Sequence, residues 1–449
     1  MRPTFPPFDV KNPQAIREQL QKLLPKSHFF VYEEVTKVGQ EMGIPALLVG
    51  GIVRDLLLGR QNLDLDFVTL SFSHPLAEQL LIYFEEQPGI TEIKLLKHDA
   101  FGTARLDVAF LDGTKLHIDL ATARHERYIH PGALPTVAID PPATLEEDLK
   151  RRDFTINALA LSPTDGLVDH YGGLEDLGEG WLRILHPQSF VDDPTRMVRG
   201  SRFAARFGYK FESETEKLLQ EAVSGLGSLT AERRRNELTL ILSEVAPDRG
   251  LAILNKYNLL SQIHPLLKRD SKVKQDFLRV RDWMAEPGYL PGRPYKKSYD
   301  NFVVYLATLC AHLLPAQTDK VVTELRYSHE AAKIPPQVSR LKHEVLPALT
   351  EALTNSQLYA RLHVYDSEAL EIAAILAPTK APLLRHFLDK VATMKPQLGG
   401  DYLKELGLKP GKQFKFILDQ LRDAVLDGKL VGREAEAEFL QKLEKDRLD

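Results

Sequence analysis

The pattern of apolar and polar residues changes near residue 185 and divides the chain into two halves. In the first half, short β-branched runs alternate with helical segments, which predicts α/β or α+β structure. In the second half, apolar residues recur at helical spacing, which predicts an all-α region. We expect strands over residues 46–49, 63–69, 93–96, 103–110, 115–121 and 157–161, and helices over residues 215–223, 231–243, 302–313 and 413–426.

Two segments interrupt the helical periodicity of the second half. Residues 286–299 contain three prolines, two glycines and three tyrosines, and no regular helix passes through such a composition. A weaker break covers residues 394–400, before a last apolar-periodic segment. We predict subdomain boundaries at both places.

The first candidate for chemistry is a pair of acids in an alternating run. On a strand, Asp64 and Asp66 share one face and lie roughly 6.5 to 7 Å apart along the chain. Two carboxylates on one face suit Mg²⁺, which would activate a hydroxyl and neutralise charge on a phosphoryl group. A strand whose polar face is acidic by coincidence would show the same pattern.

The residues before this pair favour a metal site over a strand whose face is acidic by coincidence. Gly50 and Gly51 form a diglycine turn between a buried strand and a short helix, where backbone amides favour a triphosphate. The turn lacks the lysine of a P-loop and the spacing of a dinucleotide fingerprint. Asp119 is a third acid on a later alternating strand, and taken alone it is more often structural than catalytic.

A second cluster places an acidic run directly before Arg152, Asp153 and Asn157. In a nucleotide site, arginine pairs with phosphate oxygens, while aspartate and asparagine hydrogen-bond ribose hydroxyls. From charge alone, a solvated helix end with salt bridges explains the cluster equally well.

A third cluster combines acids and arginines at spacings of three and four residues, which predicts that most of them project from one side of a helix. A ladder of surface ion pairs has the same spacing. The members are Asp192, Asp193, Arg196, Arg199 and Arg202.

Composition limits the classes of partner and compartment. The 58 Lys and Arg residues against 62 Asp and Glu residues give a net charge of −4, so a polyanion must meet a local basic patch. The single cysteine, Cys310, excludes an intramolecular disulfide and favours a reducing compartment. No signal-peptide run or membrane-spanning stretch occurs, so we expect a soluble, cytoplasmic protein with no membrane contact.

The motifs together resemble a known family. The runs LVGGIVRDLLLGRQNLDLDFV and EEDLKRRDFTINALAL are similar, almost position for position, to the class II tRNA nucleotidyltransferases, which build or repair the 3′ CCA end of tRNA. The bacterial poly(A) polymerases are relatives of these enzymes. The similarity extends through residues 165–177, 190–203 and 232–238.

This resemblance implies an α+β fold. A polymerase-β-like nucleotidyltransferase head with a mixed sheet would be followed by helical domains that hold the acceptor and TΨC arms of tRNA. The expected divisions are an N-terminal extension over residues 1–27, a catalytic head over 28–185, a neck for nucleotide recognition and RNA binding over 186–285, a body over 286–394 and a tail over 395–449.

The resemblance also assigns residues. Asp64 and Asp66 would be catalytic and would bind Mg²⁺, with Asp119 as a weaker metal candidate. The nucleotide-binding set would be Gly50, Gly51 and Arg54 for the triphosphate, Arg152 and Asp153 for the sugar, Asn157 beside them, and Asp192, Asp193, Arg196 and Arg199 on the neck.

In the family, the acid and arginine that correspond to Asp193 and Arg196 read the Watson–Crick edge of the incoming nucleotide. Cytosine and adenine present an amino donor beside a ring-nitrogen acceptor, which a carboxylate and an arginine match. Asp192 replaces the usual glutamate, which puts its own role in doubt.

Residues 398–414 resemble the tail of longer family members. Lys409, Lys412 and Lys415 could bind RNA phosphate there, although a helix-packing turn with solvated lysines is an equal alternative.

The leading prediction is a template-independent enzyme that transfers CMP and/or AMP from CTP and ATP to the 3′ end of tRNA and releases pyrophosphate. The first alternative is an A-only-adding enzyme or a poly(A) polymerase, and the wording of residues 128–135 is closer to that branch. The second is a non-catalytic RNA-binding module, which the intact acidic pair argues against. No obligate protein partner is inferred.

Overall fold

The computed structural model describes residues 5–285 and 300–445. It divides into two compact units. The first contains the chain up to Thr230 together with Lys256–Gln262, and the second contains Ala231–Asn255 and the chain from Ile263 onward. No described helix is long and apolar enough to cross a membrane.

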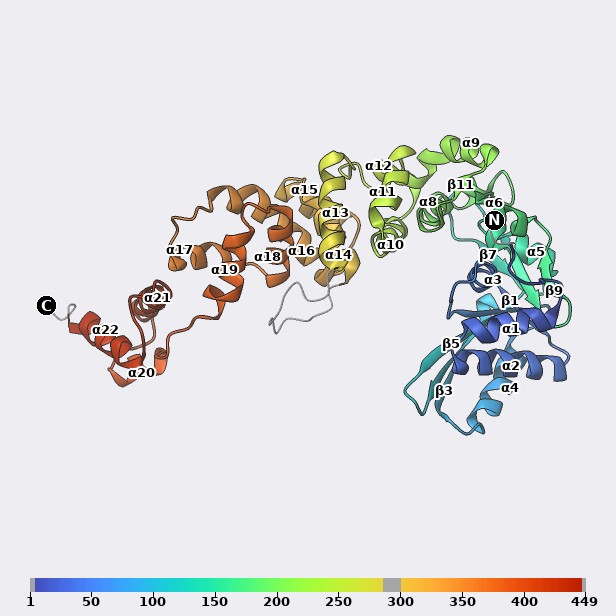
Figure 1. Cartoon of the computed structure of the whole chain (residues 1–449), viewed down its shortest axis with the longest axis horizontal. Helices are drawn as coiled ribbons and strands as arrows, with labels where there is room; N and C mark the ends of the chain where they lie inside the picture. Colours follow the sequence, from blue (N-terminus) through green and yellow to red (C-terminus); the bar gives the residue numbers. More distant parts are fainter. Residues whose placement is uncertain (1–4, 286–299, 446–449) are drawn as a thin grey trace. The chain divides into compact units, whose positions relative to one another are not determined.

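The first unit is built on a mixed seven-stranded sheet in the order β3-β4-β5-β2-β1-β8-β9 (Figure 1). Neighbouring strands are antiparallel except β2 and β5, which are parallel. The strands are β1 (Ala46–Val49), β2 (Leu65–Thr69), β3 (Ile90–His98), β4 (Thr103–Phe110), β5 (Lys115–Thr122), β8 (Leu159–Ser162) and β9 (Gly166–Asp169). Two small ladders pair β6 (His125–Arg127) with β7 (Thr136–Ala138), and β10 (Trp181–Leu182) with β11 (Lys210–Phe211).

Helices α2 (Lys26–Glu41) and α4 (His74–Glu85) pack on one face of the sheet. The alternation in β5 explains the choice of face, because Leu116, Ile118 and Leu120 are buried while Lys115 and His117 are exposed. Helix α1 (Pro13–Leu23) lies beside α2 in Figure 1 and contacts it. The expected N-terminal extension is therefore packed into the first unit.

The opposite face of the sheet is covered only in part. A second hydrophobic core lies over β1, β2 and β8 and includes Val49, Val68, Leu149 and Ala160. Leu149 belongs to α5 (Leu145–Lys150), which starts with a capping box at Thr144. The polar side chains of β4 and β5 remain open to solvent on this face.

Five further α-helices lie wholly within the described part of the first unit. They are α3 (Gly51–Leu57), α6 (Gly173–Glu179), α7 (Ser189–Asp192), α8 (Thr195–Phe207) and α9 (Ser213–Ala222).

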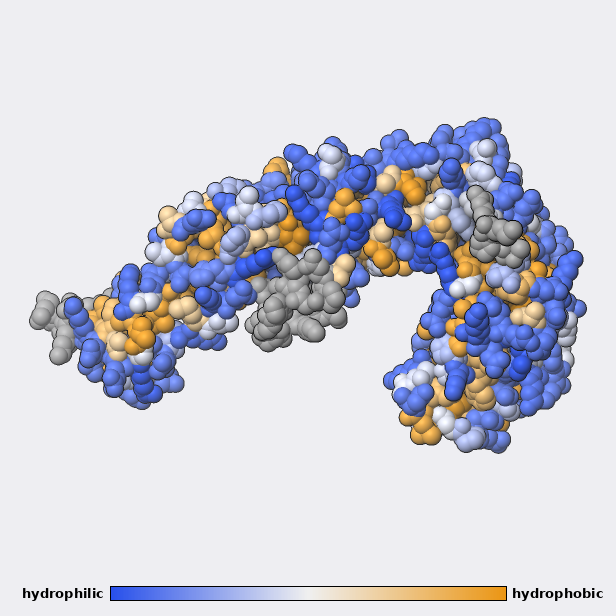
Figure 2. All heavy atoms as spheres, viewed as in Figure 1, coloured by the Kyte–Doolittle hydropathy of each residue, from blue (hydrophilic) through white to orange (hydrophobic). Residues whose placement is uncertain are grey.

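The described part of the second unit is helical. Its helices are α10 (Ala231–Leu242), α11 (Pro247–Lys256), α12 (Leu259–Ile263, at the division), α13 (Ser271–Ala285), α14 (Asn301–Cys310), α15 (Pro315–Glu324), α16 (His329–Arg340), α17 (Asn355–Leu362), α18 (Ser367–Leu376), α19 (Ala381–Asp389), α20 (Gly400–Glu405), α21 (Lys412–Leu426) and α22 (Arg433–Lys445). The last three share a small core of their own around Leu403, Ile417 and Leu421. In Figure 2, hydrophobic atoms gather over these helices, as a core this small predicts.

The α+β prediction is confirmed, and most expected elements match within a few residues. Most of the third cluster lies on one helix, as expected: its three arginines belong to α8, whereas its two acids do not. Asp193 is extended, with φ −133° and ψ 92°, because Pro194 follows it. Both acids thus precede α8, which carries only the arginines. The boundary predicted over residues 286–299 lies outside the described residues.

Candidate active site

The two predicted carboxylates lie at the start of β2. Asp66 belongs to the strand, and Asp64 precedes it by one residue. Leu65 and Phe67 point into the core and are each 1% exposed, so both carboxylates lie on the open face. The side chain of Asn62 accepts a hydrogen bond from the backbone N–H of Asp64 at 2.9 Å and fixes the turn into the strand.

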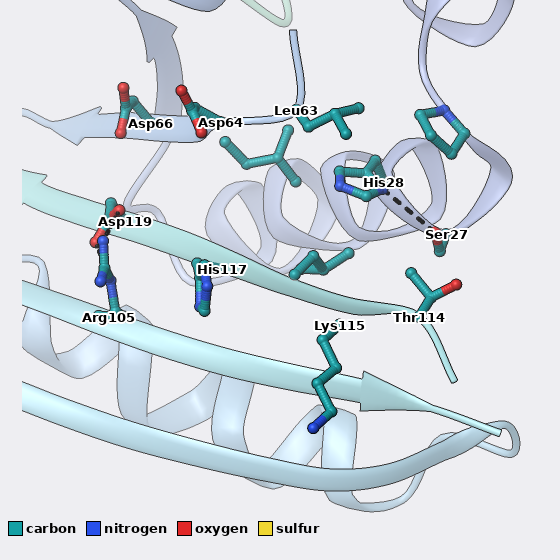
Figure 3. Close-up of a pocket in the computed structure, with 13 residues that line it drawn as sticks. Ser27, His28, Leu63, Asp64, Asp66, Arg105, Thr114, Lys115, His117 and Asp119 are labelled. Atoms are coloured by element: carbon teal, nitrogen blue, oxygen red, sulfur yellow. Dashed lines mark hydrogen bonds and ion pairs between the residues drawn. The ribbon is translucent and has the colours of Figure 1, made fainter. Parts of the chain in front are cut away.

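Asp119 lies beside Asp66, because these two residues are register partners on the parallel strands β2 and β5 (Figure 3). Arg105, the cross-strand partner of Asp119 on β4, donates to both of its carboxylate oxygens, at 2.9 and 2.8 Å. The structure thus brings the three predicted acids together. The role of Asp119 as a metal ligand stays a prediction, since Arg105 occupies its oxygens.

The acids repel one another. The pKa of Asp66 is raised to about 6, first by burial and then by the charges of Asp119 and Asp64. A cation would relieve this repulsion. Mg²⁺ commonly takes one or two carboxylates from a protein and completes its shell with substrate phosphates and water, so Asp64 and Asp66 fit it. Within residues 5–285 and 300–445, no cluster of three or more metal-ligating side chains occurs.

Two cavities meet at the carboxylates. The larger, of about 770 Å³, extends from them toward the start of β5, and the smaller, of about 390 Å³, extends toward α5. Asp66, Arg105 and Asp119 line both cavities. The carboxylates can therefore act on groups that enter from two directions.

The diglycine turn lies beside Arg152, one of the residues that line the smaller cavity. Gly50 has φ +78° and ψ −132°, a conformation that favours glycine, and a Cβ atom there would lie 3.0 Å from Arg152 Nη1. The turn thus lets the backbone and Arg152 approach each other closely. Arg152 also donates to Asp148 at 3.2 Å, while its Nε is buried with no hydrogen-bond partner among the described residues. Such an orphaned donor is typical of a site that binds an anion.

Arg54, Asn157, Asp153 and Arg199 form one buried network rather than separate contacts. Arg54 donates to Asp55 at 2.9 and 2.8 Å and to Asn157 at 2.6 Å. Asn157 donates to Asp153 at 2.9 Å, and Arg199 donates to the other oxygen of Asp153 at 3.0 and 2.7 Å. The network joins α3, the 3₁₀ turn at Thr155–Asn157 and α8.

This network bears on two sequence predictions. Arg54 is 4% exposed and lines neither cavity, and its guanidinium also lies 4.8 Å from the ring centre of Phe207. Its contacts support a positioning role, and direct binding of a triphosphate stays a prediction. Burial alone would raise the pKa of Asp153, but Arg199 and the hydrogen bonds from Asn157 and Arg199 outweigh burial and lower it.

Arg196 on α8 reaches back to the head. Its guanidinium donates to the backbone carbonyl of Arg151 at 2.7 Å and to the hydroxyl of Ser189 at 2.6 Å, and it contacts the hydroxyl of Tyr128 at 3.4 Å. Asp193 accepts hydrogen bonds from the backbone and side chain of Thr195, at 3.0 and 2.7 Å, and so caps α8. Arg196 is thereby tied to Arg151, a residue that lines the smaller cavity.

Asp192 contacts the segment of residues 123–142. Its carbonyl accepts a hydrogen bond from the backbone of Gly132 at 3.2 Å, and its carboxylate lies 4.0 Å from Nδ1 of His186. These contacts favour an anchoring role, while nucleotide binding by Asp192 stays a prediction.

Sequence reasoning missed the acids that hold the arginines in place. Asp148 is fully buried and binds Arg151 at 2.7 Å as well as Arg152, and Glu126 binds Arg151 at 2.7 Å. The spacing of three and four residues from Asp148 to the two arginines was a usable signal. Glu126 could not be found from the sequence, because it comes from a separate ladder.

The tail lysines lie as expected on the surface. Lys409, Lys412 and Lys415 are all exposed around the start of α21, and Phe416 beside them is 50% exposed. Their binding of RNA stays a prediction.

Comparisons with known proteins agree with this fold. Residues 46–183 match the Poly A polymerase head domain, and residues 208–270 match the family described as the probable RNA and SrmB-binding site of polymerase A. The first match contains all the sheet strands from β1 to β9 and both Asp64 and Asp66.

Individual relatives narrow the family. An A-adding tRNA nucleotidyltransferase of Geobacter sulfurreducens is 32% identical over 94% of this chain, and the chain spans about half (48%) of that relative. An A-adding tRNA nucleotidyltransferase of Halalkalibacterium halodurans is 28% identical, with 87% of each chain covered. The solved apo form II of a CCA-adding enzyme is 30% identical with a TM-score of 0.76, covering 95% of this chain and 98% of that one. The chain belongs to the class II tRNA nucleotidyltransferase family, and the predicted family is confirmed.

Proposed function

We propose that this protein transfers CMP and/or AMP from CTP or ATP to the 3′ end of tRNA and releases pyrophosphate. The single observation that carries the proposal is the arrangement of the acids: Asp64 directly precedes β2, and Asp66 on β2 and Asp119 on β5 lie side by side where two cavities meet. A protein that only binds RNA needs basic side chains to contact phosphates. Acidic side chains that repel one another would not help it to bind.

The reaction forms a bond between the 3′ oxygen of the RNA and the α-phosphorus of the nucleotide. The bond from that phosphorus to pyrophosphate breaks, and the hydroxyl proton passes to solvent. Arg152 and the diglycine turn would bind the triphosphate, and Asp193 and Arg196 would select the base. Such a reaction depends mainly on positioning and on charge stabilisation.

Asp64 and Asp66 would hold Mg²⁺, which lowers the pKa of the attacking hydroxyl and neutralises charge on the phosphates. The chain's own contribution is to fix the two carboxylates on a rigid strand. We also place the activity in a reducing, cytoplasmic compartment, which the single buried thiol of Cys310 suits.

Within this activity, we favour addition of A. Both curated relatives described above are named A-adding enzymes. The wording of residues 128–135, which is closer to the A-adding and poly(A) polymerase branch, supports this choice, and Tyr128 of that run contacts Arg196.

The test uses three tRNA transcripts that end at the discriminator base, at C and at CC. Purified protein with Mg²⁺ and one nucleotide at a time should extend the CC transcript by a single A from ATP. Extension of the discriminator transcript with CTP would show CC addition as well, and many added A residues would show a poly(A) polymerase. No extension of any transcript would contradict the proposal.

A further inference from the structure

The two cavities at the carboxylates differ in the residues that line them. The smaller contains the family's nucleotide-binding side, with Asp148, Arg151 and Arg152. The larger shares only Asp66, Arg105 and Asp119 with it and is not lined by Arg152, the member of the predicted nucleotide-binding set that lines the smaller one. The reaction has two substrates, the nucleotide and the 3′ end of the RNA. If the nucleotide occupies the smaller cavity, the larger cavity is free for the RNA.

The larger cavity has opposite charges at its two ends, as Figure 3 shows. Asp64 and Asp66 lie at one end, and Lys115 lies at the other, at the exposed start of β5. His117 lies between them on the same face of β5 as Asp119. Its Nδ1 lies 2.6 Å from Asp107, so the ring is oriented with Nε2 available for a ligand.

The remaining walls suit a base or a sugar. Leu63, which is 45% exposed, supplies apolar surface, and the buried side chains of Leu65 and Leu116 lie behind it. His28 comes from the start of α2, where the hydroxyl of Ser27 lies 3.3 Å from its Nδ1. The volume of about 770 Å³ lies within the range of small-molecule sites. One nucleotide fits such a site.

The charges at the two ends of the larger cavity also determine how a bound 3′-terminal nucleotide would be oriented. A nucleotide at the 3′ end of an RNA has a free hydroxyl at one side of its sugar and a phosphate at the other. The hydroxyl must lie at the carboxylates, and the phosphate is favoured near Lys115 and His117. In-line displacement also requires the attacking oxygen to approach opposite the leaving pyrophosphate.

We propose that the larger cavity is the acceptor subsite, which binds the 3′-terminal nucleotide of the RNA, with Lys115 and His117 as positioning residues for its phosphate. This inference rests on the proposed function and assigns the place of its second substrate. Neither residue belongs to a motif of the sequence analysis.

The first test compares steady-state kinetics with a tRNA ending in CC and with ATP as varied substrates. Lys115→Ala together with His117→Ala should raise the KM for tRNA by about tenfold or more, since two contacts to a phosphate are lost. The KM for ATP should stay within about twofold. Lys115→Arg keeps the positive charge, so its KM for tRNA should stay close to that of the unmutated protein.

Lys94→Ala is the matched control. Lys94 is also an exposed lysine on this sheet, where it pairs with Glu92 at 2.6 Å, but it does not line the cavity. Its replacement should leave both KM values unchanged. An unchanged KM for tRNA in the double variant, or a raised KM for ATP, would overturn the assignment.

A second test locates the RNA directly. A tRNA whose last nucleotide is 4-thiouridine is irradiated in complex with the full-length protein, and the crosslinked peptide is mapped. Crosslinks to residues 63–66 or 114–119 support the acceptor subsite, and crosslinks confined to residues 148–153 overturn it. Failure of the proposed function is distinguishable, because the unmutated protein would then extend no transcript.

Discussion

Two groups of charged residues in the first unit differ in how far their charges are satisfied. The acids of β2 lie at an open cavity and repel one another, and Asp66 has a raised pKa. The network from Arg54 to Arg199 is mostly buried, its charges are paired, and the pKa of Asp153 is lowered. Both groups come from family motifs.

The contrast separates two uses of charge. Unrelieved repulsion costs stability and is retained where a ligand relieves it, whereas a paired network fixes the positions of the elements that it joins. We therefore expect chemistry from the first group and positioning from the second. The following predictions test this division, from the largest effect to the smallest.

The largest effect should come from Asp64→Ala and Asp66→Ala. Each should lower nucleotide addition by at least about two orders of magnitude, because charge stabilisation in the transition state is lost. The melting temperature should not fall, because each substitution removes repulsion. Single-turnover extension assays and thermal melts check both parts, and full activity in both variants would refute the metal assignment.

Asp153→Ala should act in the opposite way, by lowering the free energy of unfolding by about 3 to 5 kcal/mol. It leaves Arg199 and Asn157 without their shared acceptor. Denaturant unfolding measures the change. Asp401→Ala is the control, since it removes only an exposed pair with Lys404 and should change stability little. Equal effects of the two variants would contradict the division.

The same network predicts a pH dependence. Because the folded-state pKa of Asp153 lies below its unfolded value of about 3.9, its contribution is present above that pH. The contribution is lost as pH falls through the folded-state pKa. The difference in unfolding free energy between the unmutated protein and Asp153→Asn should therefore shrink below about pH 4, and a constant difference would show that charge is irrelevant.

Substitution of Asp193 tests whether one residue can both contact the substrate and hold a helix in place. Asp193→Asn keeps an oxygen for the cap of α8 but removes the charge proposed to read the base. The preference for ATP or CTP over GTP and UTP should fall by about 1 to 3 kcal/mol per lost contact, or roughly 5- to 150-fold.

Arg196→Ala should lower the same ratio. Competition assays with all four nucleotides provide the measurement. If both variants lower every nucleotide equally and also lower the melting temperature, Asp193 and Arg196 are structural residues only.

Gly50→Ala should strain the turn by about 1 to 3 kcal/mol and should raise the KM for ATP, because the new Cβ displaces Arg152. Gly59→Ala is a matched control. Gly59 also has a positive φ, of +66°, but its Cβ would meet no atom within 4 Å. A KM that rises equally in both variants would exclude a specific role of the contact between Gly50 and Arg152.

The smallest effect should come from Lys409, Lys412 and Lys415. Their joint replacement by Ala should weaken tRNA binding without changing nucleotide choice. The slope of the logarithm of the binding constant against the logarithm of salt concentration should fall in magnitude by up to about 3. Filter binding at several salt concentrations measures this slope. An unaltered slope would return these lysines to the role of solvated surface charges.

The sequence by itself determined the strands and the acid pair. Alternation such as that of residues 63–68 fixes which side chains are buried, and the rule is local because successive side chains of a strand point to opposite faces. Family motifs added the glycine turn and the arginine cluster. These inferences need no knowledge of which strand lies beside which.

Only the tertiary structure decided which residues meet. Asp119 reaches Asp66 because β5 pairs with β2 across 53 residues of chain, and Arg54 meets Asn157 across 103 residues. The sequence could not separate Arg54, which is buried and paired, from Arg152, whose Nε lacks a partner among the described residues. Burial and pairing depend on strand order and helix docking, and a charged residue's local sequence does not encode them.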